Sequence, residues 1–574
     1  MTKWERLDIA ALILGVLALF VEQSDPRPLV AVLVHVLDFG IMFLIVWAAI
    51  EEIRNAVYRW NYIRGHWASL LFLLAFMSLF LYSKYLAFFK VDSAGLGSLA
   101  MTLRNVFIVL KVSSRMRKLF KFFERMAAKP AQTVIVSFAL VILAGSIGLM
   151  LGMATTDGKG LDFLDALFTS TSAVCVTGLV VVDTATALSR GGQAVVLILI
   201  QIGGLGIMLF SFFVMVALRR RLSLKDRLTV SYMLSEDDMS GLSGSLRAIV
   251  LSTLGIESAG ALVLFIRFIT LRYPVGDAAF YAAFHAISAF CNAGFALFSD
   301  SLESFRGDPV VTLAIAVLIV AGGISFGVIK DLRSWLRSTL GRMTGRGSTK
   351  MLVVSQNSRV VLSLTALLLL SGFIGFYLLE HEGVMAGYGL GEQYLGALFQ
   401  SVTLRTAGFN SVPFGTLRDG TLIFMILFMF VGGASGSTAG GIKINTLAAM
   451  AAFLRSFLRQ EKSARIGNSA VANEKVGRAF LILIFGLCAV LAGVFILSLT
   501  EDAPFINLLF ESVSAFGTVG LSTGVTPDLS AVGKSTVILL MFLGRLGPLT
   551  ILTAASSKEP QGQVEYPQGD LAIG

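Results

Sequence analysis

Long apolar runs alternate with short amphipathic stretches along most of this chain, and the alternation repeats four times. Each copy is an apolar helix, a short amphipathic helix, a loop and a second apolar helix. The long runs reach about twenty residues, enough to cross the ~30 Å hydrocarbon layer of a bilayer. The expected helices are 131–153, 162–173 and 191–218; 246–269, 278–289 and 309–329; 359–379, 392–403 and 421–450; and 479–499, 505–515 and 535–555.

A common loop motif follows each short helix. The loops read SAVCVTGL at 172–179, SAFCNAGF at 288–295, TLRTAGF at 403–409 and SAFGTVGL at 514–521. Successive loop glycines are 116, 114 and 112 residues apart, at Gly178, Gly294, Gly408 and Gly520. A near-constant period of this kind indicates copies of one structural unit.

The amphipathic helices are too short to span a membrane. Each has a phenylalanine ten residues before the loop glycine, or nine in the third copy: Phe168, Phe284, Phe399 and Phe510. Irregular backbone at membrane depth is tolerated only where it is buried in protein or faces water. A half-helix followed by a glycine loop therefore predicts a re-entrant pore loop, and the shorter third copy breaks strict fourfold symmetry.

These patterns predict an all-α integral membrane protein with four tandem helix–pore-loop–helix repeats. The repeats are expected to have pseudo-fourfold symmetry around one pore and to follow about four extra transmembrane helices. The predicted boundaries are 1–126 for the N-terminal region, 127–235, 236–345, 346–465 and 466–556 for the repeats, and 557–574 for a disordered tail.

The N-terminal region has candidate helices at 8–21, 29–50, 67–89 and 98–126, and the last of them carries a basic stripe. Its residues share one helical face: Arg104, Lys111, Arg115, Lys118, Lys121 and Arg125. Four helices with such a stripe resemble a voltage-sensor domain, with Arg104, Lys111, Arg115 and Lys118 as the candidate sensing residues. The alternative is a helix whose basic half lies in the cytoplasm.

Composition and charge agree with a membrane protein. Hydrophobic residues make up 56% of the chain and charged residues 14%, against about 25% charged in soluble domains. The net charge of +10 is concentrated in loops around 219–227, 330–350 and 455–478. The positive-inside rule places these loops and both termini in the cytoplasm, so we expect a multi-pass membrane protein with both ends on that side. No cleavable signal peptide is evident, and no nucleic-acid partner is expected.

The loops predict a selectivity filter for potassium. Potassium needs oxygens in place of its hydration shell, and backbone carbonyls supply them without fixed charge. Glycine can take a positive φ that turns a carbonyl toward the axis. No predicted filter position is charged, which disfavours a divalent site. The filter residues are Val176, Thr177, Gly178, Asn292, Ala293, Gly294, Thr406, Ala407, Gly408, Thr518, Val519 and Gly520.

A glycine pair follows each filter glycine after 24 to 28 residues, at Gly203-Gly204, Gly322-Gly323, Gly432-Gly433 and, with one replacement, Gly544-Arg545. Such pairs allow close helix packing or a kink. The third copy continues as GGASGSTAGGIKINT at 432–446, which no continuous helix would choose. We interpret this segment as a gate beside an intramembrane arginine; the alternative is a packing motif. The gate residues are Gly436, Ser437, Thr438, Gly440, Gly441, Lys443 and Arg545.

Other notable residues have modest expected roles. Arg405 and Glu511 lie on or near pore helices and are expected to pair. Glu257 is expected to pair inside the bundle or to serve structure only. Cys175 and Cys291 occupy equivalent places three residues before the loop glycine, where small packed residues are expected.

The four loops, with GGASGSTAGGIKINT and the GRLGPLT segment at 544–550, resemble the Ktr/Trk/HKT superfamily of potassium transporters, in particular the Ktr-type (KtrB-like) membrane subunits. The resemblance covers 131–556. It implies a potassium-translocating homodimer with the gate at 432–446 and Arg545 beneath the filter. It also implies cytoplasmic nucleotide-binding regulatory subunits of the RCK/KTN type. Glycine at all four filter positions matches potassium-preferring members, and the N-terminal 125 residues depart from the family core.

The leading functional hypothesis is potassium uptake, with sodium stimulation left open. The alternative is the ion-conducting subunit of an ATP-driven potassium pump, whose ATPase would be a separate subunit because the chain has no Walker motif. A membrane enzyme is unsupported, because the four histidines are scattered and form no catalytic constellation. We therefore expect no catalytic or cofactor-binding residues, with K⁺ as the transported ion and Na⁺ as a second candidate.

Overall fold

The computed structural model describes residues 130–206, 242–343, 354–461, 463–467 and 469–555, together with Arg54 and Ser78. The predicted N-terminal helices, the candidate voltage-sensing residues Arg104, Lys111, Arg115 and Lys118, and the predicted tail lie outside the described residues.

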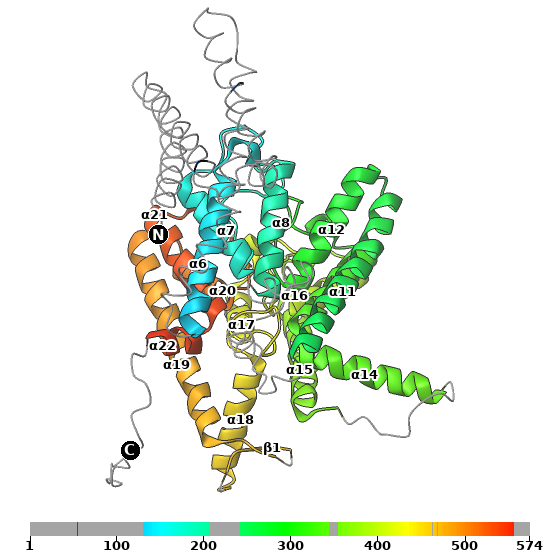
Figure 1. The fold of residues 1–574 in the computed structure, drawn as a ribbon, viewed down its shortest axis with the longest axis vertical. Coiled ribbons are helices and arrows are strands. Elements are labelled where there is room, and N and C mark those ends of the chain that lie inside the picture. Colours follow the sequence, from blue (N-terminus) through cyan, green and yellow to red (C-terminus); the bar gives the residue numbers. More distant parts are fainter. Residues whose placement is uncertain are drawn as a thin grey trace, which may run out of the picture.

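The described chain is almost entirely helical (Figure 1). The first two units contain α6 (Pro130–Leu149), η1 (Gly152–Ala154), α7 (Phe163–Cys175), α8 (Arg190–Leu205), α11 (Leu242–Thr270), α12 (Val275–Cys291), η2 (Glu303–Phe305), α13 (Pro309–Gly323) and α14 (Phe326–Met343). The last two contain α15 (Gln356–Glu380), α16 (Leu390–Thr403), η3 (Phe414–Thr416), α17 (Asp419–Met429), α18 (Ile444–Leu458), α19 (Asn473–Thr500), α20 (Phe505–Gly517), η4 (Thr526–Asp528), α21 (Ala531–Leu546) and α22 (Pro548–Ala555).

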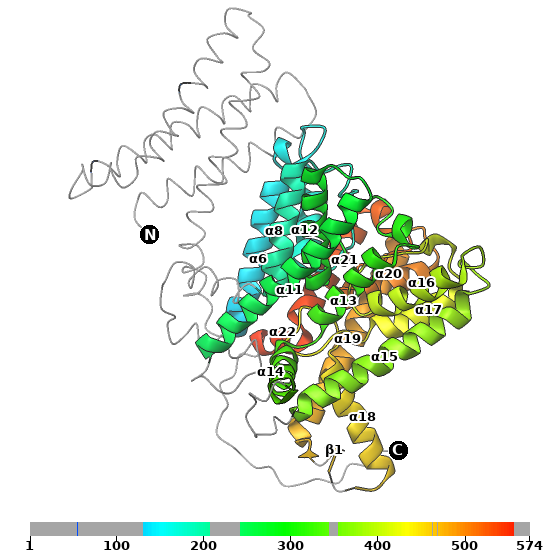
Figure 2. The same cartoon turned by 90° about the vertical axis from the view of Figure 1, so that its right-hand side faces the viewer.

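Each short predicted helix exists and lies inside the helical bundle. The helices α7, α12, α16 and α20 each pack against the long helix that precedes them (Figures 1 and 2). Their shared phenylalanines are at most 1% exposed: Phe168, Phe284, Phe399 and Phe510. These side chains hold the short helices in the core by van der Waals packing, which takes the place of a hydrophobic driving force between helices in a membrane.

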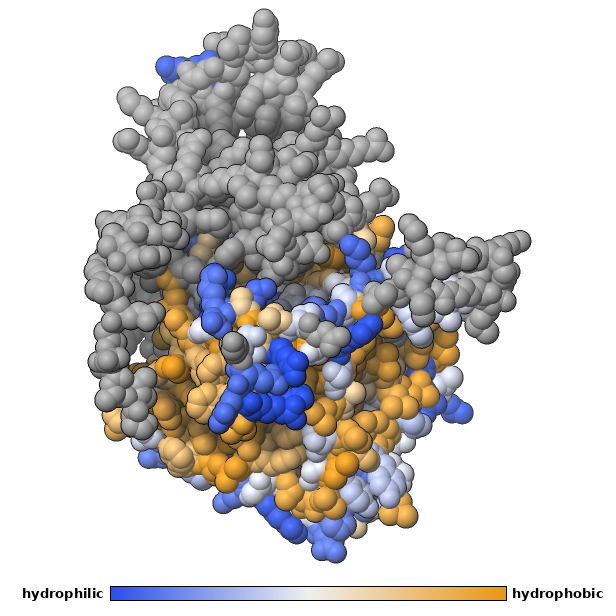
Figure 3. Space-filling model, turned by 90° about the horizontal axis from the view of Figure 1, so that it is seen from below, coloured by the Kyte–Doolittle hydropathy of each residue, from blue (hydrophilic) through white to orange (hydrophobic). Residues whose placement is uncertain are grey.

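Three of the described helices, α11, α15 and α19, are long and apolar enough to cross a membrane, and the bent pair α13–α14 is a candidate fourth span. Their outer faces expose large apolar side chains such as Leu262, Leu378 and Leu491. Seen from below, hydrophilic residues gather in a central patch that hydrophobic residues border (Figure 3). Exposed apolar area of this extent fits a surface solvated by lipid.

Two predicted continuous helices are wrong. The apolar run at 309–329 forms α13 and α14, which meet at a 108° bend, and the run at 535–555 is divided between α21 and α22 at Gly547 (φ 79°). The bend lies where the backbone N–H of Phe326 donates to the carbonyl of Gly436 in the third unit. A tertiary contact thus takes the place of a helical hydrogen bond. The predicted interruption of 421–450 is confirmed, because α17 ends at Met429 and α18 begins at Ile444.

The first and last described helices pack together. Gln132 Nε2 on α6 donates to the carbonyl of Ala554 on α22 over 3.2 Å. An ion pair also joins the first and fourth units, since Lys534 Nζ lies 2.7 Å from Asp165 Oδ1. One small departure from an all-α fold is a hairpin in which β1 (Arg465–Ile466) pairs antiparallel with β2 (Ser469–Ala470).

Candidate ion-conducting pore

Each short helix ends at a non-glycine residue in the left-handed region, at or just after its last turn. These residues are Val176 (φ 56°), Asn292 (φ 60°), Thr406 (φ 65°) and Thr518 (φ 50°). The predicted filter glycines follow two residues later, also with positive φ: Gly178 (96°), Gly294 (70°), Gly408 (78°) and Gly520 (92°). Four occurrences of an uncommon backbone conformation at equivalent places indicate that the four loops have a common conformation around the glycine.

The turn before each glycine is the same in three loops and different in the third. The N–H groups of Thr177, Ala293 and Val519 each donate 2.8 Å to a carbonyl five residues earlier. In the third loop, the N–H of Ala407 donates to the carbonyl of Thr403, only four residues earlier, over 3.0 Å. The third loop is one residue shorter than the others, and this tighter turn accounts for the difference. Its glycine still has the same positive-φ conformation.

The four glycines form a closed ring. A side-chain carbon added to Gly178 would lie 2.5 Å from the carbonyl oxygen of Ala293 in the next loop. The corresponding distance is 2.9 Å from Gly294 to Ala407, and 2.6 Å from Gly408 to Val519. Gly520 meets the carbonyl of Thr177 and so returns to the first loop. Only glycine allows backbones to approach this closely while holding a positive φ.

A hydroxyl from the last turn of each pore helix supports its own loop; we call these four residues the cap hydroxyls: Ser172, Ser288, Thr403 and Ser514. Ser172 Oγ accepts from the N–H of Gly178 over 3.0 Å, and Ser514 Oγ does the same for Gly520 over 3.1 Å. Ser288 and Thr403 instead donate to the carbonyls of the residues after their glycines, over 2.8 and 2.6 Å. The sequence motifs contain these residues, but their role was not predicted.

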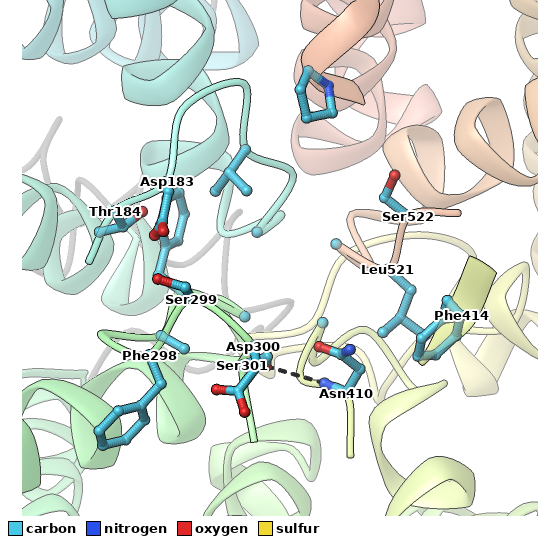
Figure 4. Close-up of a pocket in the computed structure, with 18 of the residues that line it drawn as sticks. Asp183, Thr184, Phe298, Ser299, Asp300, Ser301, Asn410, Phe414, Leu521 and Ser522 are labelled. Carbon is cyan, nitrogen blue, oxygen red and sulfur yellow. Dashed lines mark hydrogen bonds between the residues drawn. The ribbon is translucent and has the colours of Figure 1, made fainter. Parts of the chain in front are cut away.

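A cavity of about 400 Å³ adjoins the ring and is lined by all four predicted filter glycines. Its rim carries the carboxylates of Asp183, Asp300 and Glu303, and Ser301 Oγ accepts from the N–H of Asn410 over 3.2 Å (Figure 4). Acidic walls around a hollow raise the local concentration of cations. Burial, followed by the nearby Asp300 carboxylate, raises the pKa of Glu303, and the Asn410 amide offsets part of this effect. These acidic residues were not singled out in the sequence.

The glycine-rich segment between α17 and α18 lies against the other units. Thr438 Oγ1 donates to the carbonyl of Gly322 over 2.9 Å, and Gly440 contacts the Thr518 side chain of the fourth loop. The Arg545 guanidinium donates to the carbonyl of Thr438 through Nη1 and to that of Gly203 through Nη2. Lys443 Nζ donates to the carbonyl of Ala439 within the segment. Arg545 therefore joins the first, third and fourth units at one point.

The predicted close packing at the glycine pairs is present. Gly203, Gly322 and Gly544 each touch the carbonyl of a pore-helix residue two positions before the left-handed residue, namely Val174, Phe290 and Phe516. A side chain at these positions would displace the pore helix. In the third unit, Gly432 instead contacts Gly440, because the helix has already ended.

The predicted pair of Arg405 and Glu511 does not form in the described part of the chain. Glu511 Oε1 accepts from Thr526 Oγ1, and Arg405 Nε and Nη2 have no hydrogen-bond partner among the described residues. Glu257 pairs inside the bundle, where Gln201 Nε2 donates to its Oε1 over 3.2 Å and Cys291 Sγ lies 3.9 Å away. Cys175 and Cys291 are buried free thiols, as predicted for packed small residues.

Helices long enough to cross a membrane surround a ring of uncharged loops, an arrangement typical of ion-transport proteins. Comparison with known proteins agrees. A family model described as TrkH, cation transport protein, matches residues 101–566. The chain is 39% identical over 445 residues to the Ktr system potassium uptake protein B of Bacillus subtilis, covering 78% of this chain and 97% of that protein.

Two further matches extend the comparison. The potassium/sodium uptake protein NtpJ of Enterococcus hirae is 33% identical over 457 residues, with 78% of this chain and 98% of that protein covered. The crystal structure of the potassium transporter TrkH from Vibrio parahaemolyticus shares the fold, with a TM-score of 0.61, 18% identity and coverage of 85% and 97%. The chain belongs to the TrkH cation transport family and is a Ktr-like member of the Ktr/Trk/HKT superfamily. It is a multi-pass membrane transporter and not an enzyme.

Proposed function

We propose that this protein takes up potassium through a filter made by the four glycine loops, arranged with pseudo-fourfold symmetry around one pore. The single observation that carries the proposal is the closed ring of backbone contacts from Gly178 through Gly294 and Gly408 to Gly520. The carbonyls in this ring are uncharged ligands suited to a monovalent cation. Relatives named as potassium uptake proteins support K⁺, and the relative named as a potassium/sodium uptake protein makes Na⁺ the second ion to test.

The remaining filter positions support the same proposal. The hydroxyls of Thr177, Thr406 and Thr518 are buried and have no hydrogen-bond partner within the described ranges. Buried polar groups normally find a partner. A desolvated cation in the filter would provide one.

We further propose that the segment 432–446 and Arg545 form an intramembrane gate beneath the filter. The segment contacts the second unit through Thr438 and the fourth through Gly440. Arg545 places a positive charge beside it. The assembly is proposed to be a homodimer in the plasma membrane with both termini cytoplasmic, regulated by cytoplasmic nucleotide-binding subunits of the RCK/KTN type.

Potassium uptake is tested in cells that lack their own potassium uptake systems. Expression of the chain with a Ktr-type regulatory subunit should restore growth at limiting K⁺ and produce ⁸⁶Rb⁺ uptake that excess K⁺ competes away. An ATP-driven pump subunit would instead require a partner ATPase. Absence of uptake despite correct membrane insertion would contradict the proposal.

The acidic rim predicts a dependence on external pH. Because the Glu303 pKa is raised, this carboxylate gains a proton at a higher pH than an ordinary glutamate does. Uptake at limiting K⁺ should therefore fall as the pH drops. The loss of one charge should raise the apparent KM about two- to threefold at low ionic strength and less in high salt.

Replacing the carboxylate separates this effect from other titrations. Glu303→Gln should have the raised KM already at neutral pH and should lose most of the pH dependence in ⁸⁶Rb⁺ uptake. Glu382→Gln is the matched control, because Glu382 is an exposed loop carboxylate outside the cavity lining. Equal pH profiles for wild type and Glu303→Gln would contradict the assignment.

A further inference from the structure

One helical turn before the cap hydroxyls, the pore helices carry a second set of polar residues. We call them the rear positions: Thr169, His285, Gln400 and Glu511. Each lies three residues before a cap hydroxyl and therefore on the same helix face. Each is at most 1% exposed. Polar side chains this deeply buried need partners.

In the second unit, His285 ties the pore helix to the segment that leaves the filter. The N–H of Leu297, three residues past Gly294, donates to His285 Nε2 over 3.2 Å. His285 Nδ1 lies 2.7 Å from the carbonyl of Tyr281. A backbone N–H only donates and a carbonyl only accepts, so the imidazole is neutral with its proton on Nδ1. The ring also stacks on Phe298, with 4.8 Å between centroids.

The third and fourth units make the same connection with different chemistry. Gln400 Nε2 donates to Ser411 Oγ, three residues past Gly408, over 3.3 Å. Glu511 Oε1 accepts from Thr526 Oγ1, whose oxygen lies 3.0 Å from Ser522 Oγ. Ser522 follows Gly520 by two residues. In the second, third and fourth units, a rear side chain therefore connects the pore helix to the segment that follows the loop glycine.

The first unit lacks this connection in the described part of the molecule. Its rear residue is Thr169, whose buried Oγ1 has no hydrogen-bond partner there. The first loop is thus held by the cap hydroxyl of Ser172 and by its neighbours in the ring.

We propose that His285, Gln400 and Glu511 are positioning residues that set the ion selectivity of the filter. This inference rests on the proposed potassium-conducting function. Each of the three joins its pore helix to the segment that follows the filter loop. This connection limits how far the carbonyls of the loop can move apart. Cations of different size are distinguished by the spacing and mobility of such ligands. Removing a rear connection loosens one loop and lowers the preference for K⁺ over Na⁺.

The third unit allows a double-mutant cycle, because both partners are neutral side chains. Gln400→Leu and Ser411→Ala should each lower the K⁺-over-Na⁺ uptake ratio about three- to fivefold, as expected for loss of one buried hydrogen bond. The double variant should fall no further than the single ones, since both remove the same connection. Additive losses, or an unchanged ratio with uptake intact, would overturn the proposal.

Thr169→Val is the matched control, because it removes a rear hydroxyl that makes no connection among the described residues. It should retain the wild-type ratio. In the fourth unit, Glu511→Gln keeps an acceptor for Thr526 and should preserve most selectivity, whereas Glu511→Leu should not. If Gln400→Leu does not reach the membrane, the two Glu511 variants test whether a rear connection sets the selectivity. A wild-type protein without potassium uptake would refute the proposed function itself, which is a separate result.

Discussion

Gly178→Ser should lower the preference for K⁺ over Na⁺ about tenfold, the larger of the selectivity losses that we expect. Gly178 has a φ of 96°, which costs a residue with a side chain about 1–2 kcal/mol. Its new Cβ would also lie 2.5 Å from the carbonyl oxygen of Ala293. That carbonyl belongs to the proposed filter, so it must move for the serine to fit.

The measurement is the ratio of ⁸⁶Rb⁺ to ²²Na⁺ uptake at equal amounts of protein in the membrane. Gly158→Ser is the matched control, because Gly158 also has a positive φ (76°) but a Cβ there would meet nothing within 4 Å. The Gly158→Ser variant therefore has the backbone strain of a positive φ but no contact between the new Cβ and a neighbouring carbonyl. An unchanged ratio in Gly178→Ser would remove this loop from the filter.

Arg545→Gln should raise the rate of potassium uptake about fivefold or more. The guanidinium holds the carbonyls of Thr438 and Gly203, and each charge-assisted hydrogen bond is worth about 1.5–3 kcal/mol. Even ~1 kcal/mol less stabilisation of the closed segment changes its open fraction about fivefold. Glutamine also removes a positive charge from the proposed cation path.

Initial ⁸⁶Rb⁺ uptake, measured with and without the regulatory subunit, tests this expectation. The variant should depend less on that subunit than wild type does. Arg478→Gln is the control for loss of a positive charge, since Arg478 is exposed and pairs with Glu474 on its own helix. Deleting part of 436–441 should also raise flux. A slower Arg545→Gln protein, equally abundant and inserted, would contradict the gate.

The shared conformation of the four loops was predictable because it depends on residues close together in the sequence. A glycine at fixed spacing, preceded by small residues and a short helix, fixes the loop without knowledge of its neighbours. The interruption at 432–446 was predictable for the same reason, since its glycines and hydroxyl residues cannot continue an apolar helix.

The bend between α13 and α14 was only partly predictable from its own residues. The Gly322-Gly323 pair in the run at 309–329 allows a kink, but the hydrogen bond at the bend, from the N–H of Phe326 to the carbonyl of Gly436, comes from a different unit. The expected pair of Arg405 and Glu511 failed for a related reason. Opposite charges in a sequence do not tell which helix face each side chain occupies, and Glu511 faces Thr526 on its own loop.

The role of the rear positions could not be predicted by comparing the four copies residue by residue. Threonine, histidine, glutamine and glutamate are all polar but differ in size, shape and charge, so a comparison of residue types does not group them. They share their position on the pore helix. Three of them also contact the segment that follows the loop glycine, and these contacts are known only from the three-dimensional structure.

The hydrogen bond between Gln132 and Ala554 has a topological consequence. The first and last helices of the four units, α6 and α22, are adjacent. The order of the units around the ring would therefore be the same wherever the chain began. A short linker from 555 to 130, with new ends placed in a connection between units, would give a circular permutant with the same neighbours at every contact. The covalent order could then be changed without changing the pore, because the ring is closed by packing and not by the polypeptide.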